Sequence, residues 1–415
     1  MACRFSRFGD RQASAYEEMK GVALRELRIG LVGAGWMGKV HSMSYHTARN
    51  AFGPEPAVPI LAAVADINPE NAARAAHEFG YERAAKDWRE IVDDPTIDIV
   101  NICTPNDMHF EVAMAAIAAG KHVYCEKPLA NELDHARQMA EAAEKAGIVN
   151  LVGFNYIQNP VHVLAKKALA AGELGDINYV RLYFVCDFMA DRSLQHTWRN
   201  DLKRAGSGVI GDIGAHCLSY FYHLLDRDIE DVLCSLETVI PDHAAPLAEG
   251  GGFRLGAAGD SSRRIANTTD DLANVMFRFS GGGSGLMTLS RVSTGIRYDI
   301  GYDVTGDKGT LRYTYDRVND MYLYRDTGER EFRGFTRIEM GPSDPRFAAL
   351  HPVQGLGLGY LDYKAIEARE MIAAVGEGRE AYPGFAFGYR IQRIIAACQK
   401  SHETRSWVKV DNQAT

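Results

Sequence analysis

Short apolar runs separated by amphipathic segments set the pattern of the first 150 residues. We predict strands at five such runs, which cover residues 28–32, 60–65, 97–103, 122–125 and 149–154. Runs this short and continuous are typical of strands that are buried on both faces of a parallel sheet. Residues 133–146 carry apolar side chains at helical spacing, with Asn131 and Gly147 as the expected N-cap and C-cap. This alternation of strand and helix predicts a doubly wound α/β domain.

The pattern changes after about residue 155, where β-rich segments follow one another through short glycine-containing links. They cover residues 177–188, 231–240, 270–279, 284–292, 299–305 and 309–315. This order predicts a largely antiparallel sheet and therefore a second, α+β domain. Helical patterns return at 362–376 and 387–400, while 241–268 and 328–358 are expected to be long irregular loops.

The composition is that of an ordinary folded protein, with 46% hydrophobic and 24% charged residues among 415. The 46 Lys and Arg against 54 Asp and Glu give a formal net charge of −8, so no basic excess is present to neutralise a nucleic-acid backbone. For this reason we do not expect nucleic acid as a partner. We find no apolar run of 18 residues, so we do not expect a membrane as a partner either. The seven cysteines are scattered without zinc-ligand spacing, which predicts reduced thiols in a cytoplasmic protein and no metal site.

A glycine-rich turn directly follows the first predicted strand and opens a helix. Its sequence, Gly33-Ala34-Gly35-Trp36-Met37-Gly38, has the G-x-G-x-x-G spacing in which glycines permit a tight turn, approach to a diphosphate and close helix packing. Asp66 ends the second strand, where a carboxylate can accept hydrogen bonds from both adenosine ribose hydroxyls and repels a 2′-phosphate. We therefore expect NAD rather than NADP as cofactor. Asp66 stands 31 residues after Gly35 instead of about 20, and the proline-rich segment 50–59 accounts for the excess.

Further motifs appear in a fixed order along the chain. They are Cys103-Thr104-Pro105-Asn106 with His109, then Glu126-Lys127-Pro128, then Gly206-Ser207-Gly208, and then Gly211-Asp212-Ile213-Gly214-Ala215-His216. Together with the glycine turn, this set resembles the glucose–fructose oxidoreductase/inositol dehydrogenase/rhizopine catabolism (Gfo/Idh/MocA) oxidoreductases over residues 27–407. The resemblance implies a Rossmann domain plus a C-terminal α/β domain with an open, mostly antiparallel sheet, through which such proteins often form homodimers or homotetramers.

These expectations divide the chain into four parts. We expect a leader at 1–26, a dinucleotide-binding Rossmann domain at 27–153, a substrate-binding and oligomerisation domain at 154–407, and a tail at 408–415.

Lys127, Asp212 and His216 are the candidate catalytic residues. Lys127 follows a parallel strand at the carboxyl edge, where α/β sheets bind ligands, and its ammonium can hydrogen-bond a substrate hydroxyl. Asp212 and His216 are four residues apart and share a face if 211–225 is helical. A neutral imidazole suits a base that accepts an alcohol proton. The resemblance implies that Lys127 is catalytic, that His216 is the general base and that Asp212 is its partner. A strand-end lysine and a structural histidine are the alternatives for single residues of these kinds.

Other candidates follow strands or precede the second glycine motif. The resemblance implies that Glu126 and Lys127 border the nicotinamide ring and that a Trp198-Arg199 pair lies beside the pocket, although Trp198 is equally well a core residue. The turn after the third strand can touch the ribose and nicotinamide, which makes Thr104, Pro105, Asn106 and His109 candidates. Asn155 follows the fifth strand and is expected to face cofactor and substrate, and Asp187 ends a strand that can line the substrate site.

The resulting hypothesis is a reversible, NAD-dependent and metal-free oxidation of a secondary hydroxyl on a sugar, glycoside, anhydrosugar or inositol. The substrate class comes from the resemblance alone. Two alternatives remain: a non-catalytic regulator that binds NAD and a sugar, and a reductase of imine, tetrapyrrole or dihydrodiol substrates. The presence of both Lys127 and His216 favours an enzyme over the regulator.

Overall fold

A computed structural model describes residues 25–54, 56–247 and 257–412, so most of the expected leader and the last residues of the tail lie outside the described residues. The first domain is built on a six-stranded parallel sheet with the order β3-β2-β1-β4-β5-β6. Its strands are β1 (Glu26–Val32), β2 (Val58–Ala65), β3 (Arg83–Ala85), β4 (Ile99–Ile102), β5 (His122–Cys125) and β6 (Asn150–Val152). This is the strand order of a Rossmann domain, which confirms the predicted doubly wound architecture.

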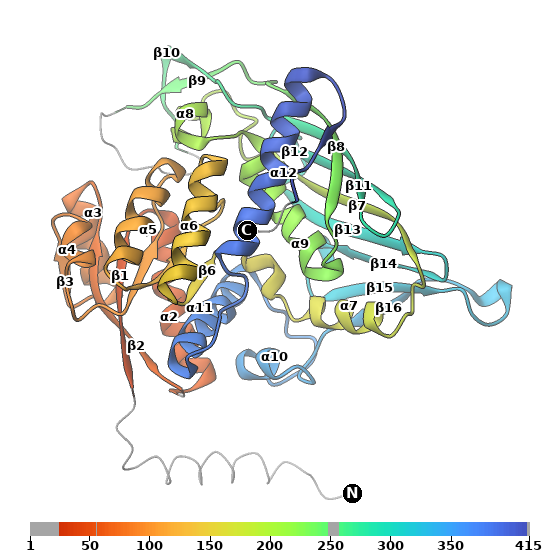
Figure 1. Cartoon of the computed structure of the whole chain (residues 1–415), viewed down its shortest axis with the longest axis horizontal. Helices are drawn as coiled ribbons and strands as arrows, with labels where there is room; N and C mark the ends of the chain where they lie inside the picture. Colours follow the sequence, from red (N-terminus) through yellow and green to blue (C-terminus); the bar gives the residue numbers. More distant parts are fainter. Residues whose placement is uncertain (1–24, 55, 248–256, 413–415) are drawn as a thin grey trace, which may run out of the picture.

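Helices cover both faces of this sheet (Figure 1). They are α2 (Trp36–Phe52), α3 (Pro69–Phe79), α4 (Arg89–Val92), α5 (His109–Ala118) and α6 (Leu133–Ala146). Gly147 ends α6 in the left-handed conformation, as predicted. The predicted N-cap was wrong: Glu132 holds that position, because Asn131 turns its side chain to the carbonyl of Lys203 at 3.4 Å.

The second domain is built on a nine-stranded sheet with the order β16-β15-β14-β13-β7-β12-β11-β8-β17. Its strands are β7 (Ile177–Cys186), β8 (Ile229–Glu237), β11 (Leu272–Phe279), β12 (Ser284–Ser290), β13 (Tyr298–Gly306), β14 (Gly309–Thr314), β15 (Asp320–Arg325), β16 (Thr336–Glu339) and β17 (Val408–Lys409). β7 and β12 are parallel and the other neighbours are antiparallel, which confirms the mostly antiparallel sheet. The last strand, β17, comes from the segment expected to be a tail.

The two long stretches expected to be irregular contain regular structure. A hairpin of β9 (Asp242–Ala245) and β10 (Asp260–Ala266) lies in the first, and β16 with α10 (Pro345–Leu350) lies in the second. Most side chains of β10 are exposed, so this strand has no alternation of apolar and polar residues that the sequence could reveal.

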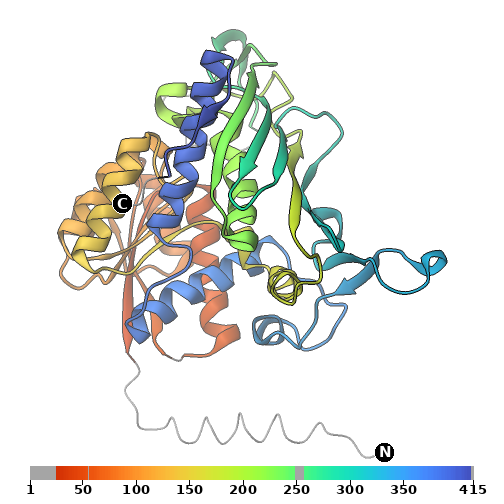
Figure 2. The same ribbon diagram turned by 45° about the vertical axis from the view of Figure 1, so that its right-hand side comes forward.

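Two long helices near the end of the chain join the domains. α11 (Tyr360–Glu377) packs along α2, while α12 (Phe385–Thr404) packs against α6 on one side and β8 on the other. Both helices, drawn in blue, run between the Rossmann sheet and the larger sheet (Figures 1 and 2). α7 (Val161–Ala170), α8 (Leu202–Ala205) and α9 (Ala215–Leu225) complete the second domain. Within the described ranges, no helix combines the length and apolar character needed to cross a bilayer.

Candidate active site

The glycine turn between β1 and α2 has one open position and two tightly packed ones. Gly33 has a φ of +96°, and a Cβ atom there would lie 2.7 Å from the backbone of Cys103. A Cβ on Gly38 would lie 2.1 Å from the carbonyl oxygen of Gly33. A Cβ on Gly35 would meet no atom within 4 Å, and the N-terminus of α2 beside it has no side-chain cap. The turn therefore leaves space and unpaired N–H groups where a diphosphate would bind.

Asp66 ties this turn to the end of β2. Its Oδ2 accepts a hydrogen bond from the backbone N–H of Ala34 at 2.8 Å, and its Oδ1 accepts one from Asn68 N at 2.9 Å. The carboxylate is only partly buried, so one edge of the turn carries a negative charge that faces solvent. This arrangement fits a ribose with free hydroxyls and disfavours one with a 2′-phosphate.

The turn after β4 presents an unpartnered hydroxyl at its start. Thr104 Oγ1 is buried without a hydrogen-bond partner. The side chains of Asn106 and His109 hold main chain: Asn106 Nδ2 donates to Ala205 O at 2.9 Å, and the nitrogens of His109 lie 3.1 Å from Thr104 O and 3.0 Å from Pro128 O. His109 thus braces the turn that follows β4 against the one that follows β5.

Lys127 follows β5 and meets Asp212, which lies 85 residues later in the chain. The ammonium donates to the main-chain oxygen of Asp212 and lies 3.4 Å from its Oδ1. Arg199 Nε lies 3.8 Å from Oδ1 and Arg291 Nη1 lies 3.3 Å from Oδ2. Burial alone would raise the pKa of Asp212, but the three cations hold it well below its usual range. Burial and the charge of Arg199 lower the pKa of Lys127, while Asp212 opposes that shift.

A wide helical turn carries Asp212 and continues into the helix that carries His216. Residues Ile210–Gly214 (η4) form a π-helical turn that leads directly into α9. The helix predicted over 211–225 therefore begins with a π-helical turn and continues as a regular α-helix. Single π-helical turns are frequent at functional sites because they displace side chains from the regular helical faces. Asp212 thus lies on the π-helical turn and His216 on α9, so the two residues stand on consecutive elements rather than on one face of a single regular helix.

His216 is buried among aromatic rings. It is 6% exposed, its Nδ1 has no hydrogen-bond partner, and its ring meets the ring of Tyr156 edge-on at 4.6 Å between centroids. Burial and then the charge of Lys127 lower its pKa well below the usual value. The imidazole is consequently neutral at physiological pH and free to accept a proton.

An aromatic wall extends from His216 across the second domain; sequence reasoning did not find it. Its members come from five separate segments, and their ring centroids lie 5.0–6.4 Å from at least one neighbour: Tyr156, Phe184, Tyr298, Tyr315 and Tyr360. Tyr360 also stacks on the half-exposed Trp36 of the glycine turn at 5.6 Å. Tyr360 OH lies 3.5 Å from Met37 Sδ. The wall thus links the turn to the surroundings of His216.

The remaining candidates lie in different surroundings. Asn155 is 1% exposed and its Nδ2 has no partner. The guanidinium of Arg199 lies over the ring of Trp198, 4.3 Å from its centroid, and the same guanidinium reaches Asp212. Asp187 instead holds the loop after β12, through Gly295 N at 3.2 Å and Arg297 at 3.3 Å. Among the described residues, no group of His, Cys, Asp or Glu is placed to hold a metal ion.

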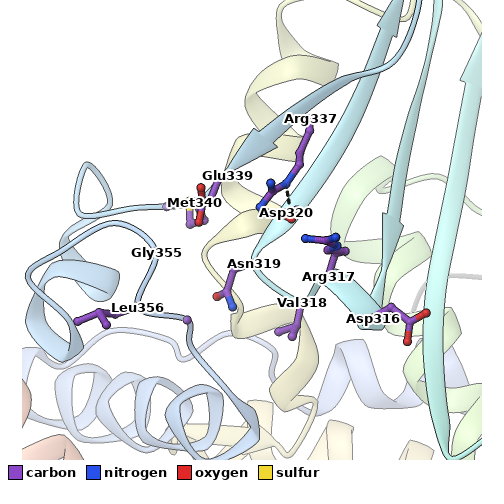
Figure 3. Close-up of a pocket in the computed structure, with 11 residues that line it drawn as sticks. Asp316, Arg317, Val318, Asn319, Asp320, Arg337, Glu339, Met340, Gly355 and Leu356 are labelled. Carbon is purple, nitrogen blue, oxygen red and sulfur yellow. Dashed lines mark hydrogen bonds and ion pairs between the residues drawn. The ribbon is translucent and has the colours of Figure 1, made fainter.

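A separate cavity of about 190 Å³ lies between the segments around Asn319, Arg337 and Leu356 (Figure 3). It is lined by residues of η5 (Tyr315–Arg317), β15 and β16 and by the 355–357 segment, and its Arg337 pairs with Asp320 at 2.6 Å. None of its lining residues is a predicted site residue, so the site follows from Lys127 and its neighbours rather than from this cavity.

Comparisons with known proteins agree with this arrangement. Residues 27–154 match the family described as "Oxidoreductase family, NAD-binding Rossmann fold", and residues 162–312 match the "GFO/IDH/MocA C-terminal domain". The levoglucosan dehydrogenase of Pseudarthrobacter phenanthrenivorans is 37% identical over 93% of this chain and 99% of its own length. The myo-inositol 2-dehydrogenase of Thermotoga maritima is 26% identical over 83% of this chain and 98% of its own.

Solved structures give the same result. A levoglucosan dehydrogenase in complex with NADH is 35% identical, covers 94% of this chain and 100% of its own, and superimposes with a TM-score of 0.87. An NAD-binding oxidoreductase from Klebsiella pneumoniae is 36% identical over the same shares, with a TM-score of 0.85. With both domains matched in order and a relative aligned over nearly its whole length, the chain belongs to the GFO/IDH/MocA oxidoreductase family.

Proposed function

We propose that the protein is an NAD-dependent dehydrogenase that reversibly oxidises a secondary hydroxyl of a sugar, glycoside, anhydrosugar or inositol to a ketone. One observation carries the proposal. Lys127 and Asp212 pair at 3.4 Å at the carboxyl edge of the parallel sheet, and the Lys127 charge lies close enough to His216 to lower its pKa. A hydrogen-bonding cation and a neutral base thus lie beside a turn that fits a dinucleotide.

The chain's own residues divide the proton chemistry. In the direction of oxidation, His216 accepts the proton of the substrate hydroxyl, because burial keeps its imidazole neutral. Lys127 donates a hydrogen bond to the same oxygen and stabilises the negative charge that develops there. Asp212 stays ionised and holds the Lys127 ammonium in place. NAD, when bound, accepts the hydride from the carbinol carbon.

The dinucleotide is held by the first domain. The open position at Gly35 and the N–H groups of α2 take the diphosphate, and Asp66 takes the adenosine ribose. Thr104 Oγ1 and Asn155 Nδ2 are buried, unpartnered polar atoms that suit the nicotinamide side of the cofactor.

The aromatic wall and the relatives support an anhydrosugar or cyclitol as substrate. Tyr298, which is 37% exposed, can offer the apolar face of its ring to the C–H face of a sugar, and its hydroxyl is hydrogen-bonded to that of the buried Tyr156. The most similar relative named above acts on levoglucosan, and the other on myo-inositol. Anhydrosugars are therefore the first substrates to test.

The test is a panel of anhydrosugars, inositols, aldoses and glycosides, each incubated with NAD or NADP while NAD(P)H absorbance is followed. We expect turnover with NAD and a preference for NAD over NADP set by Asp66. Tight NAD binding without turnover of any panel member would refute the dehydrogenase and favour the regulator. NADH consumption only with imines or dihydrodiols would favour the reductase.

We also propose that the enzyme works in the cytoplasm as a homodimer or homotetramer joined through the nine-stranded sheet. One face of that sheet packs on α9 and α12, and the other presents the large side chains of Tyr179 and Met276, 39% and 45% exposed. Light scattering during size-exclusion chromatography tests the assembly, and a Met276→Asp variant should dissociate it. An unchanged mass for this variant would place the interface elsewhere.

A further inference from the structure

Behind Lys127 lies a group of buried ionisable side chains that the proposed chemistry does not use. This buried charge cluster consists of His41 on α2, Glu126 at the end of β5, and Lys364 and Glu367 on α11. Each of the four is at most 6% exposed. Ionised groups are expensive to bury, so a cluster of this kind needs a compensating arrangement.

Lys364 is at the centre of the cluster. Its ammonium bonds Glu126 Oε1, lies 2.8 Å from Glu367 Oε2, and lies 3.2 Å from His41 Nε2. An ammonium has three protons to donate, and the carboxylates of Glu126 and Glu367 both accept from it. His41 Nε2 also lies 2.8 Å from Glu126 Oε1, and its Nδ1 lies 3.0 Å from Asn101 Oδ1. The cluster therefore joins three elements of the fold at one point.

Glu126 transmits this arrangement to the catalytic lysine. Its second oxygen, Oε2, accepts a hydrogen bond from the backbone N–H of Lys127 at 3.2 Å. Gly153 lies against this pair: a Cβ there would lie 2.7 Å from Glu126 Oε1 and 3.1 Å from Lys364 Nζ, so a side chain at position 153 would displace the carboxylate. A connected path thus runs from Lys364 through Glu126 to the main chain of Lys127.

We propose that Lys364 is a positioning residue, which fixes Glu126 and thereby holds the Lys127 main chain and ammonium at the reacting oxygen. The inference rests on the proposed dehydrogenase function. It adds a role for α11, a helix of the second domain that also supplies Tyr360 to the aromatic wall.

The cluster also contributes charge near His216. The ionised groups that influence His216 are Lys127 and Lys364, which lower its pKa, and Glu126 and Asp212, which raise it. Its other close neighbours are the rings of Phe154, Tyr156 and Phe184. Removing Lys364 should therefore raise the pKa of His216, and neutralising Glu126 should lower it.

The experiment compares Lys364→Met, Glu126→Gln, the double variant and a matched control. Lys121→Met is the control, because Lys121 is also buried and donates to two carbonyls, those of Asp94 and Ile97, without touching the cluster. We expect each single cluster variant to lower kcat at least tenfold while KM for NAD changes less. We expect the double variant to lose no more than the worse single one, because both act through one path. The control should keep wild-type kcat.

Two readouts separate positioning from a merely structural role. The acid limb of kcat/KM should move to higher pH in Lys364→Met and to lower pH in Glu126→Gln. The exchange rate of the Lys127 backbone amide should rise in all cluster variants and remain unchanged in Lys121→Met. Amide exchange requires no turnover, so it decides the positioning role even if the wild-type enzyme oxidises no panel sugar and the proposed function fails.

Lys364→Met leaves two buried carboxylates without their counter-ion and can fail to fold. The double variant avoids this, because only Glu367 then remains, and burial has raised the pKa of Glu367 to about 7. The proposal would be overturned if the Glu126→Gln and double variants fold and keep the wild-type kcat, the wild-type pH profile of kcat/KM and the wild-type exchange rate of the Lys127 amide. Additive losses in the double variant would overturn the single path through Glu126.

Discussion

Alanine substitutions at two glycines of the turn between β1 and α2 should have different effects on NAD binding and on stability. Gly35→Ala places a Cβ in space that is open in the protein but is the expected place of the diphosphate. Gly38→Ala places a Cβ 2.1 Å from the carbonyl oxygen of Gly33, so backbone must move. The first variant should lose NAD affinity with little loss of stability, and the second should lose both.

The magnitudes follow from the geometry. Gly35 has a φ of −70°, which alanine adopts freely, so the cost to folding is about 0.5 kcal/mol for a poorer N-cap. Loss of one or two charged hydrogen bonds at about 1.5 kcal/mol each would weaken NAD binding roughly 10- to 100-fold. Overpacking at Gly38 costs about 1–3 kcal/mol, which lowers the Tm of a 415-residue chain by about 1–3 °C.

Thermal unfolding with and without NAD measures both effects. At 100 times its Kd, NAD should stabilise the wild-type protein by about 2.7 kcal/mol, or about 3 °C in Tm for a chain of this length. A 100-fold weaker Gly35→Ala should gain only about 0.5 °C at the same concentration. Gly334→Ala is the matched control, because its Cβ would also meet no atom within 4 Å. If Gly35→Ala kept the full NAD-induced shift, the turn would not be the diphosphate site.

Three further predictions concern charge. Lys127→Met should lower kcat/KM about 10²- to 10⁴-fold and leave the NAD Kd nearly unchanged; near-normal steady-state kinetics would contradict its role. Asp212→Asn removes a charge that raises the pKa of Lys127, so the alkaline limb of the rate profile should move to lower pH, and an unmoved limb would exclude Lys127 as its source. Burial, with Lys166 and Arg346, lowers the pKa of His223 to about 3. Below pH 6.5, the approximate pKa of this histidine in the unfolded chain, the unfolded chain binds a proton that the folded protein does not. The free energy of unfolding should therefore decrease by up to about 1.4 kcal/mol for each unit by which the pH is lowered. His223→Gln should lose less stability between pH 7 and pH 5 in urea titrations, and equal losses in both proteins would contradict this.

The parts of the fold with a strong periodic signal were predictable. β1 ends in the apolar run Ile29 to Val32, β5 is apolar after His122, and α6 begins and ends at the residues that its apolar spacing predicts. β3 and β17 have three and two residues, too few for any period to show. Asn131 has the chemistry of an N-cap, but a tertiary contact with Lys203 competes for its side chain.

The site was predictable where residues stand in motifs and not where they converge from single positions. Lys127, Asp212 and His216 lie within short motifs, and the structure brings Lys127 to Asp212. Arg291 is a lone arginine after a strand, yet it is fully buried and pairs with Asp212. Lys364 and Glu367 have the spacing of an exposed helical ion pair, and only the packing of α11 on α2 buries them.

Burial and charge together explain why a lysine and a histidine can act on one substrate oxygen. Asp212 pairs with Lys127, Arg199 and Arg291, and Arg291 also pairs with the buried Asp271. Burial, with the charge of Lys127 acting in the same direction, keeps His216 neutral and thus able to accept a proton, but it also makes the imidazole a weak base. The weakness is tolerable only if the substrate oxygen becomes more acidic at the same time, which the Lys127 ammonium achieves by binding it. The base and the cation are therefore useful only together, and the distance between them must be held by buried structure such as Arg291 on one side and Lys364 on the other.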